Sequence, residues 1–259
     1  MKDQQHTIKR YQYKMIAVIF WLACWQLLSM RINNVIFLPS PLQTIGNLLE
    51  LGQTIEFWKT VSNSVLRIGG GFFLAVILAN LLVLLTCRFK VFNEIIILGM
   101  QIIKSIPVAA FIILALLWIQ SKNLSILISF LMVLPMIYTS LLKGIESTDS
   151  KLLEMAKVFR LSNMKKLRYI YLPAVLPYII TACSVSLGFC WKSGIAAEVI
   201  SIAQYSIGGR LYDAKLYYDT KEVFAWVIVI VCISILFERL VMYLIQRLSR
   251  LITKTKAED

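Results

Sequence analysis

Long apolar runs separated by short polar stretches make up most of the chain. Six of these runs are about as long as the roughly 20 helical residues that cross about 30 Å of hydrocarbon. They are continuous and do not alternate with polar residues, so they predict helices, which satisfy their own backbone hydrogen bonds in lipid. The predicted spans are residues 15–30, 68–87, 95–119, 124–142, 174–200 and 223–245. We therefore expect an all-α integral membrane protein with about six transmembrane helices.

The polar stretch between the fourth and fifth predicted spans has a helical pattern of its own. Its apolar side chains recur at i, i+3, i+4 and i+7, as on one face of a helix: Leu152, Met155, Ala156 and Phe159. Glu154 falls on another, charged face. Asp149 or Ser150 can cap the start of this helix, and Ser162 with Asn163 can end it.

A second short helix is predicted directly after the first. Its apolar stripe consists of Met164, Leu167, Ile170 and Tyr171. Pro173 and Pro177 then fit the first turn of the fifth span, where backbone N–H groups need no intrahelical partner. Residues 148–173 therefore predict one or two short amphipathic helices. Such helices either lie among lipid headgroups or dock against a soluble partner.

Composition and charge agree with a membrane protein and indicate its orientation. Of the 259 residues, 59% are hydrophobic and 16% charged, so they cannot all be buried in one soluble core. Lys and Arg accumulate on the cytoplasmic side of membranes, and 18 of the 27 here precede the first span, follow the second or the fourth, or fall between Arg239 and Lys256. Both termini and residues 148–173 are thus expected to be cytoplasmic. Residues 1–14 and 247–259 form tails on a membrane domain of residues 15–246, and the net charge of +13 suits anionic lipid without any nucleic acid.

The chain lacks the residue clusters that metal, cofactor or nucleotide chemistry requires. The five Cys fall in or at the end of apolar spans without metal-ligand spacing, and the single His6 lies in the polar N-terminal tail. Gly69, Gly70 and Gly71 are not followed by the Lys of a phosphate-binding loop. We expect no metal, no cofactor and no enzymatic activity, so that any ATP hydrolysis belongs to another subunit.

Residues 154–173 resemble the EAA signature of permease subunits of bacterial ATP-binding-cassette (ABC) importers. That signature reads Glu-Ala-Ala, three residues, Gly, nine residues, Ile-x-Leu-Pro. Five positions match at the same offsets: Glu154, Ala156, Ile170, Leu172 and Pro173. Met155 replaces the first Ala, and Arg160 stands where the family usually has Gly for a tight turn. Ser162 and Asn163 are the alternative place for that turn.

The resemblance covers most of residues 38–245 and points to the nitrate, sulfonate and taurine branch of these importers. The motifs that carry it are Leu38-Pro39-Ser40-Pro41, Ser64-Val65-Leu66-Arg67 before Gly71-Phe72, Ile106-Pro107, Gly188-x-x-Trp191 and Ala197-Glu198. A second Pro often follows the first in the third span, but Val108 stands there.

This resemblance implies a type I importer (MetI-like) permease fold in the bacterial inner membrane. It implies three partners besides the lipid bilayer: a second permease copy, usually as a homodimer, a cytoplasmic ABC ATPase dimer, and an extracytoplasmic solute-binding protein. The short helix would dock into the ATPase and transmit its closure to the fifth span. The residues implied in this coupling are Glu154, Met155, Ala156, Phe159, Arg160, Ile170, Leu172 and Pro173.

Polar and bulky residues inside the spans are candidates for the translocation pathway, since a Lys in hydrocarbon costs about 2.5–3.5 kcal/mol on insertion scales. Lys192 either faces the pathway or forms an ion pair with Glu198. Lys104 either faces the cavity or snorkels to the cytoplasmic interface, and Pro107 can kink the third span. Trp191 either stacks on the solute or packs between helices, and Glu198 either contacts the solute or has a structural role near the outer gate.

A positive lining by Lys104 and Lys192 suits a small anionic solute such as a sulfonate, nitrate or bicarbonate. A thiamine-precursor-like heterocycle is the alternative within the same machinery. A secondary transporter is the alternative from another class, although residues 154–173 have no second copy in the chain. The outer segment, residues 201–222, is polar and aromatic, which suits either docking of the binding protein or an aromatic belt at the membrane interface.

Overall fold

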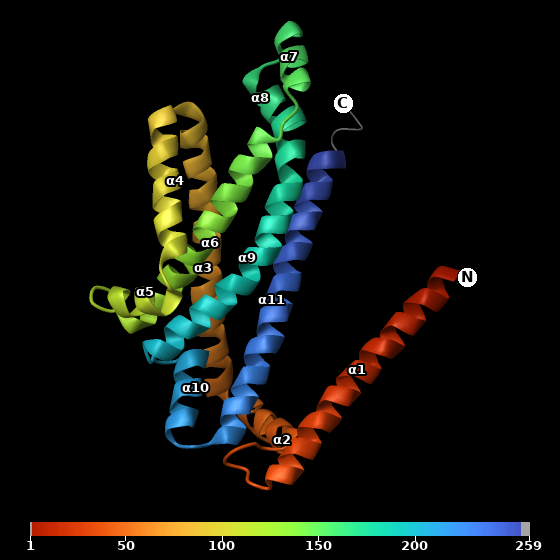
Figure 1. Cartoon of the computed structure of the whole chain (residues 1–259), viewed down its shortest axis with the longest axis vertical. Coiled ribbons are helices and arrows are strands. Elements are labelled where there is room, and N and C mark those ends of the chain that lie inside the picture. The colour runs from red at the N-terminus through yellow and green to blue at the C-terminus, as the bar shows by residue number, and fades with distance from the viewer. Residues whose placement is uncertain (1, 255–259) are drawn as a thin grey trace. The chain divides into compact units, whose positions relative to one another are not determined.

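A computed structural model describes residues 2–254, and it describes the side chains of residues 13, 15–89, 91–247 and 249. The predicted tails, residues 1–14 and 247–259, therefore lie partly outside the described residues. Within residues 2–254 the chain is helical, without a β-strand, which confirms the predicted all-α fold (Figure 1).

Eleven α-helices and one π-helical turn follow one another in this described part. They are α1 (Lys2–Ile32), α2 (Pro41–Gly52), α3 (Ile55–Arg88), α4 (Lys90–Ser105), α5 (Val108–Ala115), α6 (Ser121–Glu146), α7 (Ser150–Val158), α8 (Asn163–Lys166), the π-turn η1 (Leu167–Tyr171), α9 (Leu172–Ile200), α10 (Ile207–Leu216) and α11 (Thr220–Lys254).

Five helical segments are long and apolar enough to cross a membrane: Met15–Ile32, Ile55–Arg88, Ser121–Glu146, Asn163–Ile200 and Thr220–Arg247. The third predicted span, residues 95–119, is instead a pair of helices bent by 101° at residues 106–107. Ile106 and Pro107 both have extended backbone, with ψ of 126° and 130°. Proline has no N–H to donate and disfavours helix at the preceding residue. The expected kink is thus a complete break, and the pair counts as a sixth span if it crosses.

The helices form two compact units, of which the first comprises the chain up to Lys59 together with Arg210–Ile230. Its helix α2 begins with a capping box. Ser40 Oγ accepts from Gln43 N–H at 3.3 Å, while Gln43 Oε1 accepts from Ser40 N–H at 3.0 Å. Pro41 occupies the first helical turn, which explains why the Pro-Ser-Pro motif precedes a short helix.

The second unit comprises Thr60–Gly209 and the chain from Val231 onward, and α3, α6 and α9 meet in it at small residues. A Cβ atom on Gly194 of α9 would lie 2.6 Å from Ser129 Oγ of α6 and 2.7 Å from Ile68 Cγ1 of α3. A Cβ atom on Gly71 of α3 would lie 2.5 Å from a backbone carbonyl oxygen of α6. Small residues allow the close backbone approach that membrane helices use in place of a hydrophobic driving force.

Candidate coupling segment and translocation site

The predicted first amphipathic helix is α7. Asp149 caps it, since its Oδ1 accepts a hydrogen bond from Lys151 N–H at 2.9 Å. Ala156 is completely buried. The other members of the predicted apolar stripe are uncovered, with exposed fractions of 45% for Leu152, 46% for Met155 and 70% for Phe159. Glu154 is also exposed, so α7 presents an apolar surface with a carboxylate beside it.

The chain turns sharply at Arg160, directly after α7. Arg160 has a positive φ of 49°, the left-handed conformation that glycine adopts most readily. Leu161 N–H donates to Ala156 O at 2.9 Å and Arg160 N–H donates to Lys157 O at 3.0 Å, which is the hydrogen-bond pattern of a Schellman motif. Arg160 therefore makes the turn expected of the family's Gly.

The alternative place for this turn was wrong. Ser162 does not end the first helix but caps the second, because its Oγ accepts from Lys165 N–H at 3.4 Å. Arg160 had already reversed the chain, which leaves Ser162 free to act as an N-cap.

The second short helix and the fifth span are one continuous rod, Asn163–Ile200, of 38 residues. Pro173 lies in the first turn of α9, as expected, whereas Pro177 lies inside this helix, beyond its first turn. The π-turn η1 ends two residues before Pro173, with Leu172 N–H donating to Leu167 O. Proline crowds the carbonyl four residues before it, and a π-turn, which widens the helix by one residue, accommodates such a local disturbance.

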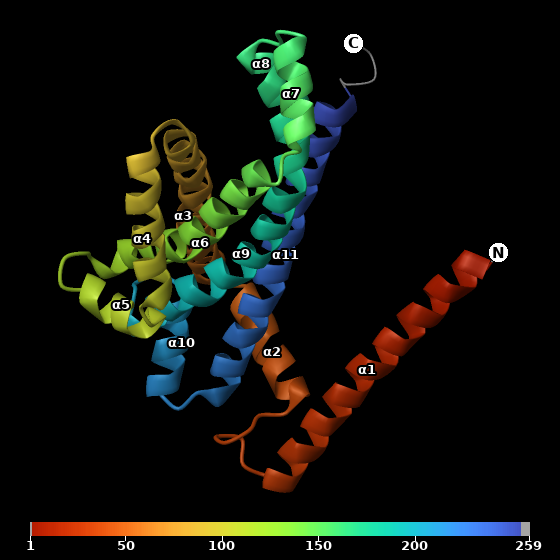
Figure 2. The ribbon, with the colours of Figure 1, turned by 45° about the horizontal axis from the view of Figure 1, so that its top comes forward.

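Residues 148–173, which we call the coupling segment, project from the end of α6 in both views (Figure 1, Figure 2). The exposed apolar surface of this segment also includes Val158 at the end of α7, 79% exposed, and continues beyond α7 over Met164, 72% exposed, and Leu167, 50% exposed. Ile170 is buried, with 7% of its surface exposed, whereas Leu172 and Pro173 are half-buried. The coupling segment thus has a root near Ile170 that is buried on the continuous helix Asn163–Ile200, and a tip around α7 that is exposed.

Lys192 is exposed on α9, with its Nζ 5.9 Å from the centroid of the Phe189 ring. The alternative of an ion pair with Glu198 is not present in the structure, because Glu198 is completely buried elsewhere. Trp191 is 1% exposed and its ring lies 5.7 Å from that of Phe237 on α11. That placement supports packing of Trp191 between helices.

Glu198 joins three segments of the second unit. Its Oε2 accepts from Ser64 Oγ at 2.8 Å and from Gly208 N–H at 3.1 Å, while Ser64 Oγ accepts from Ile207 N–H at 2.9 Å. Its other oxygen, Oε1, is buried without a protein partner. A Cβ on Gly208 would lie 2.4 Å from Glu198 Cβ, so glycine is needed for this approach. A carboxylate beside the first N–H groups of α10 is electrostatically favourable, which supports the structural role.

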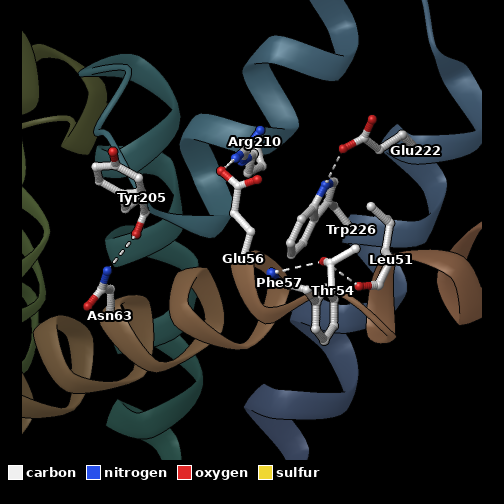
Figure 3. A network of polar contacts seen from close by, with 9 residues as sticks. All are labelled: Leu51, Thr54, Glu56, Phe57, Asn63, Tyr205, Arg210, Glu222 and Trp226. Carbon is white, nitrogen blue, oxygen red and sulfur yellow. Dashed lines mark hydrogen bonds and ion pairs between the residues drawn. The ribbon is translucent and has the colours of Figure 1, made fainter.

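Other α3 side chains secure the loop that precedes α10. Asn63 Nδ2 donates to Tyr205 O at 3.2 Å (Figure 3), and Arg67 Nη1 lies 3.4 Å from Gln204 O. Ser64 and Arg67, the first and last residues of the Ser-Val-Leu-Arg motif, therefore lie with Asn63 on the side of α3 that holds this loop.

Lys104 and Pro107 lie on the broken span. Lys104 is exposed, and its Nζ is 3.4 Å from Thr139 Oγ1 of α6. Pro107 is exposed at the break between α4 and α5. Lys104 and Lys192 thus lie on different helices and meet different side chains, Thr139 and Phe189.

Glu238 is a membrane charge that the sequence interpretation missed. It lies within α11, is half-buried, and its Oε1 is 3.4 Å from Ser184 Oγ of α9. The available signal was a carboxylate inside an apolar span, which calls for a partner or a water-filled surface.

The outer segment falls mainly in the first unit and carries its own polar contacts. Arg210 forms an ion pair with Glu56, and Trp226 Nε1 donates to Glu222 Oε1 at 3.0 Å (Figure 3). Tyr217 and Tyr218 are 79% and 77% exposed. These contacts leave a pair of aromatic side chains uncovered at the turn before α11.

Comparisons with known proteins agree with the predicted family. A sequence profile for the family "Binding-protein-dependent transport system inner membrane component" matches residues 60–253. SsuC of Bacillus subtilis, a permease protein named for aliphatic sulfonates transport, is 26% identical over 229 residues, which are 88% of this chain and 83% of SsuC. The bicarbonate transport system permease protein CmpB of Synechococcus elongatus is 28% identical over 73% of this chain and 68% of its own. The taurine transport system permease protein TauC of Escherichia coli is 26% identical over 83% of this chain and 80% of its own.

A solved structure supports the fold. The crystal structure of an amino acid ABC transporter with histidines contains a chain that superposes with a TM-score of 0.51 at 16% identity, covering 74% of this chain and 89% of that one. This likeness concerns the fold alone, and it agrees with the predicted MetI-like architecture. Since the family profile covers three quarters of the sequence, the chain belongs to the inner membrane components of binding-protein-dependent transport systems, as a permease subunit of an ABC importer.

Proposed function

We propose that this permease moves a small anionic solute and is driven by a separate cytoplasmic ATPase through α7. The observation that carries the proposal is the coupling segment itself. It ends in an uncovered apolar surface with the exposed Glu154 beside it, and it shares one continuous rod with the membrane helix α9. An exposed amphipathic helix of this kind fits a groove on a soluble partner.

The predicted coupling residues have two roles in this proposal. Those at the tip contact the ATPase: Glu154, Met155, Phe159 and Arg160. Those at the root hold the tip to the rod: Ala156, Ile170, Leu172 and Pro173. Because Ala156 and Ile170 are buried, displacement of the tip by the ATPase is passed to α9 as movement of a rigid body.

The solute is proposed to be an anion, such as a sulfonate or bicarbonate. The names of the similar permeases SsuC, TauC and CmpB support this class. The exposed amino group of Lys192 in the middle of a membrane helix gives a physical reason, since a cation in a water-filled pathway attracts anions. Lys104 and Pro107 are proposed to line the same pathway, whereas Trp191 and Glu198 hold its walls.

The full importer is proposed to contain two copies of this permease, an ATPase dimer and an extracytoplasmic binding protein. The exposed Tyr217 and Tyr218 of the outer segment are the surface on which the binding protein would dock, since aromatic side chains are enriched at protein interfaces. Both termini are placed on the cytoplasmic side of the inner membrane, with the coupling segment.

Replacement of Glu154 tests the coupling. Glu154→Ala removes a carboxylate from the proposed ATPase contact, and we expect the ATPase activity stimulated by loaded binding protein to fall about 10-fold, equivalent to about 1.4 kcal/mol. The importer is reconstituted in proteoliposomes, and the amount of inserted permease is measured alongside. The matched control is Glu94→Ala, which removes an exposed carboxylate of α4 and is expected to keep the stimulation. Full stimulation with Glu154→Ala would rule out this role.

A further inference from the structure

Among the described side chains of the second unit, two membrane charges lack an opposite charge in contact. Lys192 is exposed on α9, where its ammonium meets only the Phe189 ring. Glu238 is half-buried on α11, where its carboxylate meets only the Ser184 hydroxyl at 3.4 Å. Either charge alone in hydrocarbon is costly. The only ion pair between described side chains, Arg210 with Glu56, belongs to the first unit.

Glu238 is the acid available to Lys192. Glu198, the nearest acid along α9, is completely buried and already bound to Ser64 and Gly208. The remaining described acids of the second unit lie on the first turns of α4, at the end of α6 or on the coupling segment: Glu94, Glu146, Asp149 and Glu154. None of these lies within the membrane part of α9 or α11.

The contact between α9 and α11 lies next to both charges along the chain. Trp191 and Phe237 are in edge-to-face contact, with ring centroids 5.7 Å apart. Lys192 directly follows Trp191, and Glu238 directly follows Phe237. The charges are therefore chain neighbours of a contacting pair, and both side chains are long enough to extend past it.

Both charged groups also reach toward the same turns of α9. Side chains on a helix point back toward its N-terminus, and Lys192 Nζ accordingly lies over Phe189, one turn earlier. Glu238 Oε1 lies at Ser184, somewhat more than one further turn earlier. The ammonium thus lies at Phe189 and the carboxylate at Ser184, five residues apart on α9.

The face of α9 that carries Lys192 is uncovered. Val185 is 51% and Phe189 is 52% exposed, each about one turn from the next, whereas Leu187 and Cys190 on the other side are completely buried. A helix face with a central Lys is poorly suited to lipid, so a water-filled surface is the favourable environment for it.

We propose that Lys192 binds the anionic group of the solute and that Glu238 is its internal competitor. In the solute-free pathway the Glu238 carboxylate pairs with the Lys192 ammonium, and the arriving anion displaces it. The pair keeps both charges neutralised when the site is empty, and it makes weakly held anions compete with a tethered carboxylate. This inference rests on the proposed anionic solute and adds Glu238 as a residue that determines specificity.

Cross-linking tests whether the two residues come together. The full importer carrying Lys192→Cys and Glu238→Cys is treated with a short bifunctional thiol reagent without solute, and intramolecular linkage is read by site-resolved mass spectrometry. We expect linkage at least 10-fold faster than for the control pair Lys192→Cys and Leu236→Cys, because Leu236 lies two residues before Glu238 and points away, with 68% of its surface exposed. Equal rates for the two pairs would overturn the pairing.

Charged thiol reagents test the competition. Val185→Cys in the full importer is modified with an anionic or a cationic methanethiosulfonate, and the ratio of the two rates is measured. Loss of one nearby charge changes an interaction across a wet site by about 1 kcal/mol. We therefore expect Glu238→Gln to raise the anion-to-cation ratio about fivefold by freeing Lys192, and Lys192→Gln to lower it about as much. If pairing matters, Glu238→Gln must raise the ratio clearly less in the Lys192→Gln background.

The remaining outcomes of the reagent test also decide for or against the pairing of Lys192 with Glu238. An unreactive Val185→Cys, or the same effect of Glu238→Gln in both backgrounds, contradicts the proposal. If single variants fail to assemble with the ATPase, the exchanged variant Lys192→Glu with Glu238→Lys keeps both charges: an inverted reagent preference supports the site, and an unchanged one overturns it. ATPase coupling through Glu154 is measured in the same preparations. Intact coupling with a failed reagent test rejects this inference while leaving the proposed coupling in place.

Discussion

At the residue scale, Arg160 shows how far a motif can be carried over from sequence. The spacing of the EAA signature predicted the position of a tight turn, and the structure places the turn there, at a positive φ of 49°. The identity of the residue argued for a different place, since non-glycine residues seldom adopt this conformation. Two local backbone hydrogen bonds to Ala156 and Lys157 stabilise the turn against that cost, and the residue type at position 160 does not indicate them.

Replacing Arg160 by glycine is expected to stabilise the permease. The left-handed conformation costs a non-glycine residue about 1–2 kcal/mol. Glycine avoids this cost, but its greater freedom in the unfolded chain offsets part of the gain in stability. We expect Arg160→Gly to raise the free energy of unfolding by about 0.5–1 kcal/mol, measured by thermal unfolding of the purified protein. Arg160→Val, which is β-branched and poorly suited to a positive φ, is the control and is expected to lower the melting temperature. A lower melting temperature for Arg160→Gly would contradict the assignment of strain to this residue.

The hydrogen-bond partners of Glu198 and Glu238 could not be predicted from the sequence. Both carboxylates lie inside apolar spans, where a charge is energetically costly, but their partners Ser64 and Ser184 lie 134 and 54 residues away in the sequence. The sequence alone left two roles open for Glu198 and none for Glu238. Only the packing of α3, α9 and α11 decides which carboxylate is enclosed and which remains half-exposed.

At the element scale, hydrophobic runs predicted the membrane helices well and their continuity poorly. Apolar length correctly indicated most of the spans, because each run must bury about the thickness of the bilayer. The break at Pro107 and the lack of one at Pro173 depend on local hydrogen bonding. Pro107 follows extended backbone at Ile106, whereas the π-turn Leu167–Tyr171 lets the helix pass Pro173. Two prolines in apolar surroundings thus have opposite effects that composition does not distinguish.

The crossing of α3, α6 and α9 gives a matched pair of substitutions on one helix. A methyl group on Gly194 would meet Ser129 Oγ at 2.6 Å and Ile68 Cγ1 at 2.7 Å, whereas one on Gly188 meets nothing within 4 Å. Overpacking typically costs 1–3 kcal/mol, so we expect Gly194→Ala to destabilise the protein by about that amount. Gly188→Ala is expected to be neutral or stabilising by up to about 1 kcal/mol, since alanine favours helix. Thermal unfolding of the two variants in the same detergent checks this, and equal melting temperatures would contradict the close crossing.

At the scale of the whole molecule, the order of the helices constrains how often the chain crosses the membrane. α3 ends at Arg88, in a basic stretch expected on the cytoplasmic side, and α6 ends at Glu146, directly before the coupling segment. If both ends are cytoplasmic, α6 must begin on the outer side. The chain between them, α4 and α5, must then cross in spite of its 101° bend. In both views α4 runs back beside α3 (Figure 1, Figure 2), as a returning span would.

Topology reporters test this crossing and the orientation together. Six crossings place both termini on the cytoplasmic side, whereas a re-entrant α4 and α5 would leave five and separate them. We expect alkaline phosphatase to be active when fused after Gln120, between α5 and α6, and inactive after Ser147, between α6 and α7. A fluorescent protein that matures only in the cytoplasm is expected to fluoresce at either terminus. An inactive phosphatase after Gln120 would make the bent pair a re-entrant loop, and an active one after Ser147 would place the coupling segment outside, where no cytoplasmic ATPase could reach Glu154.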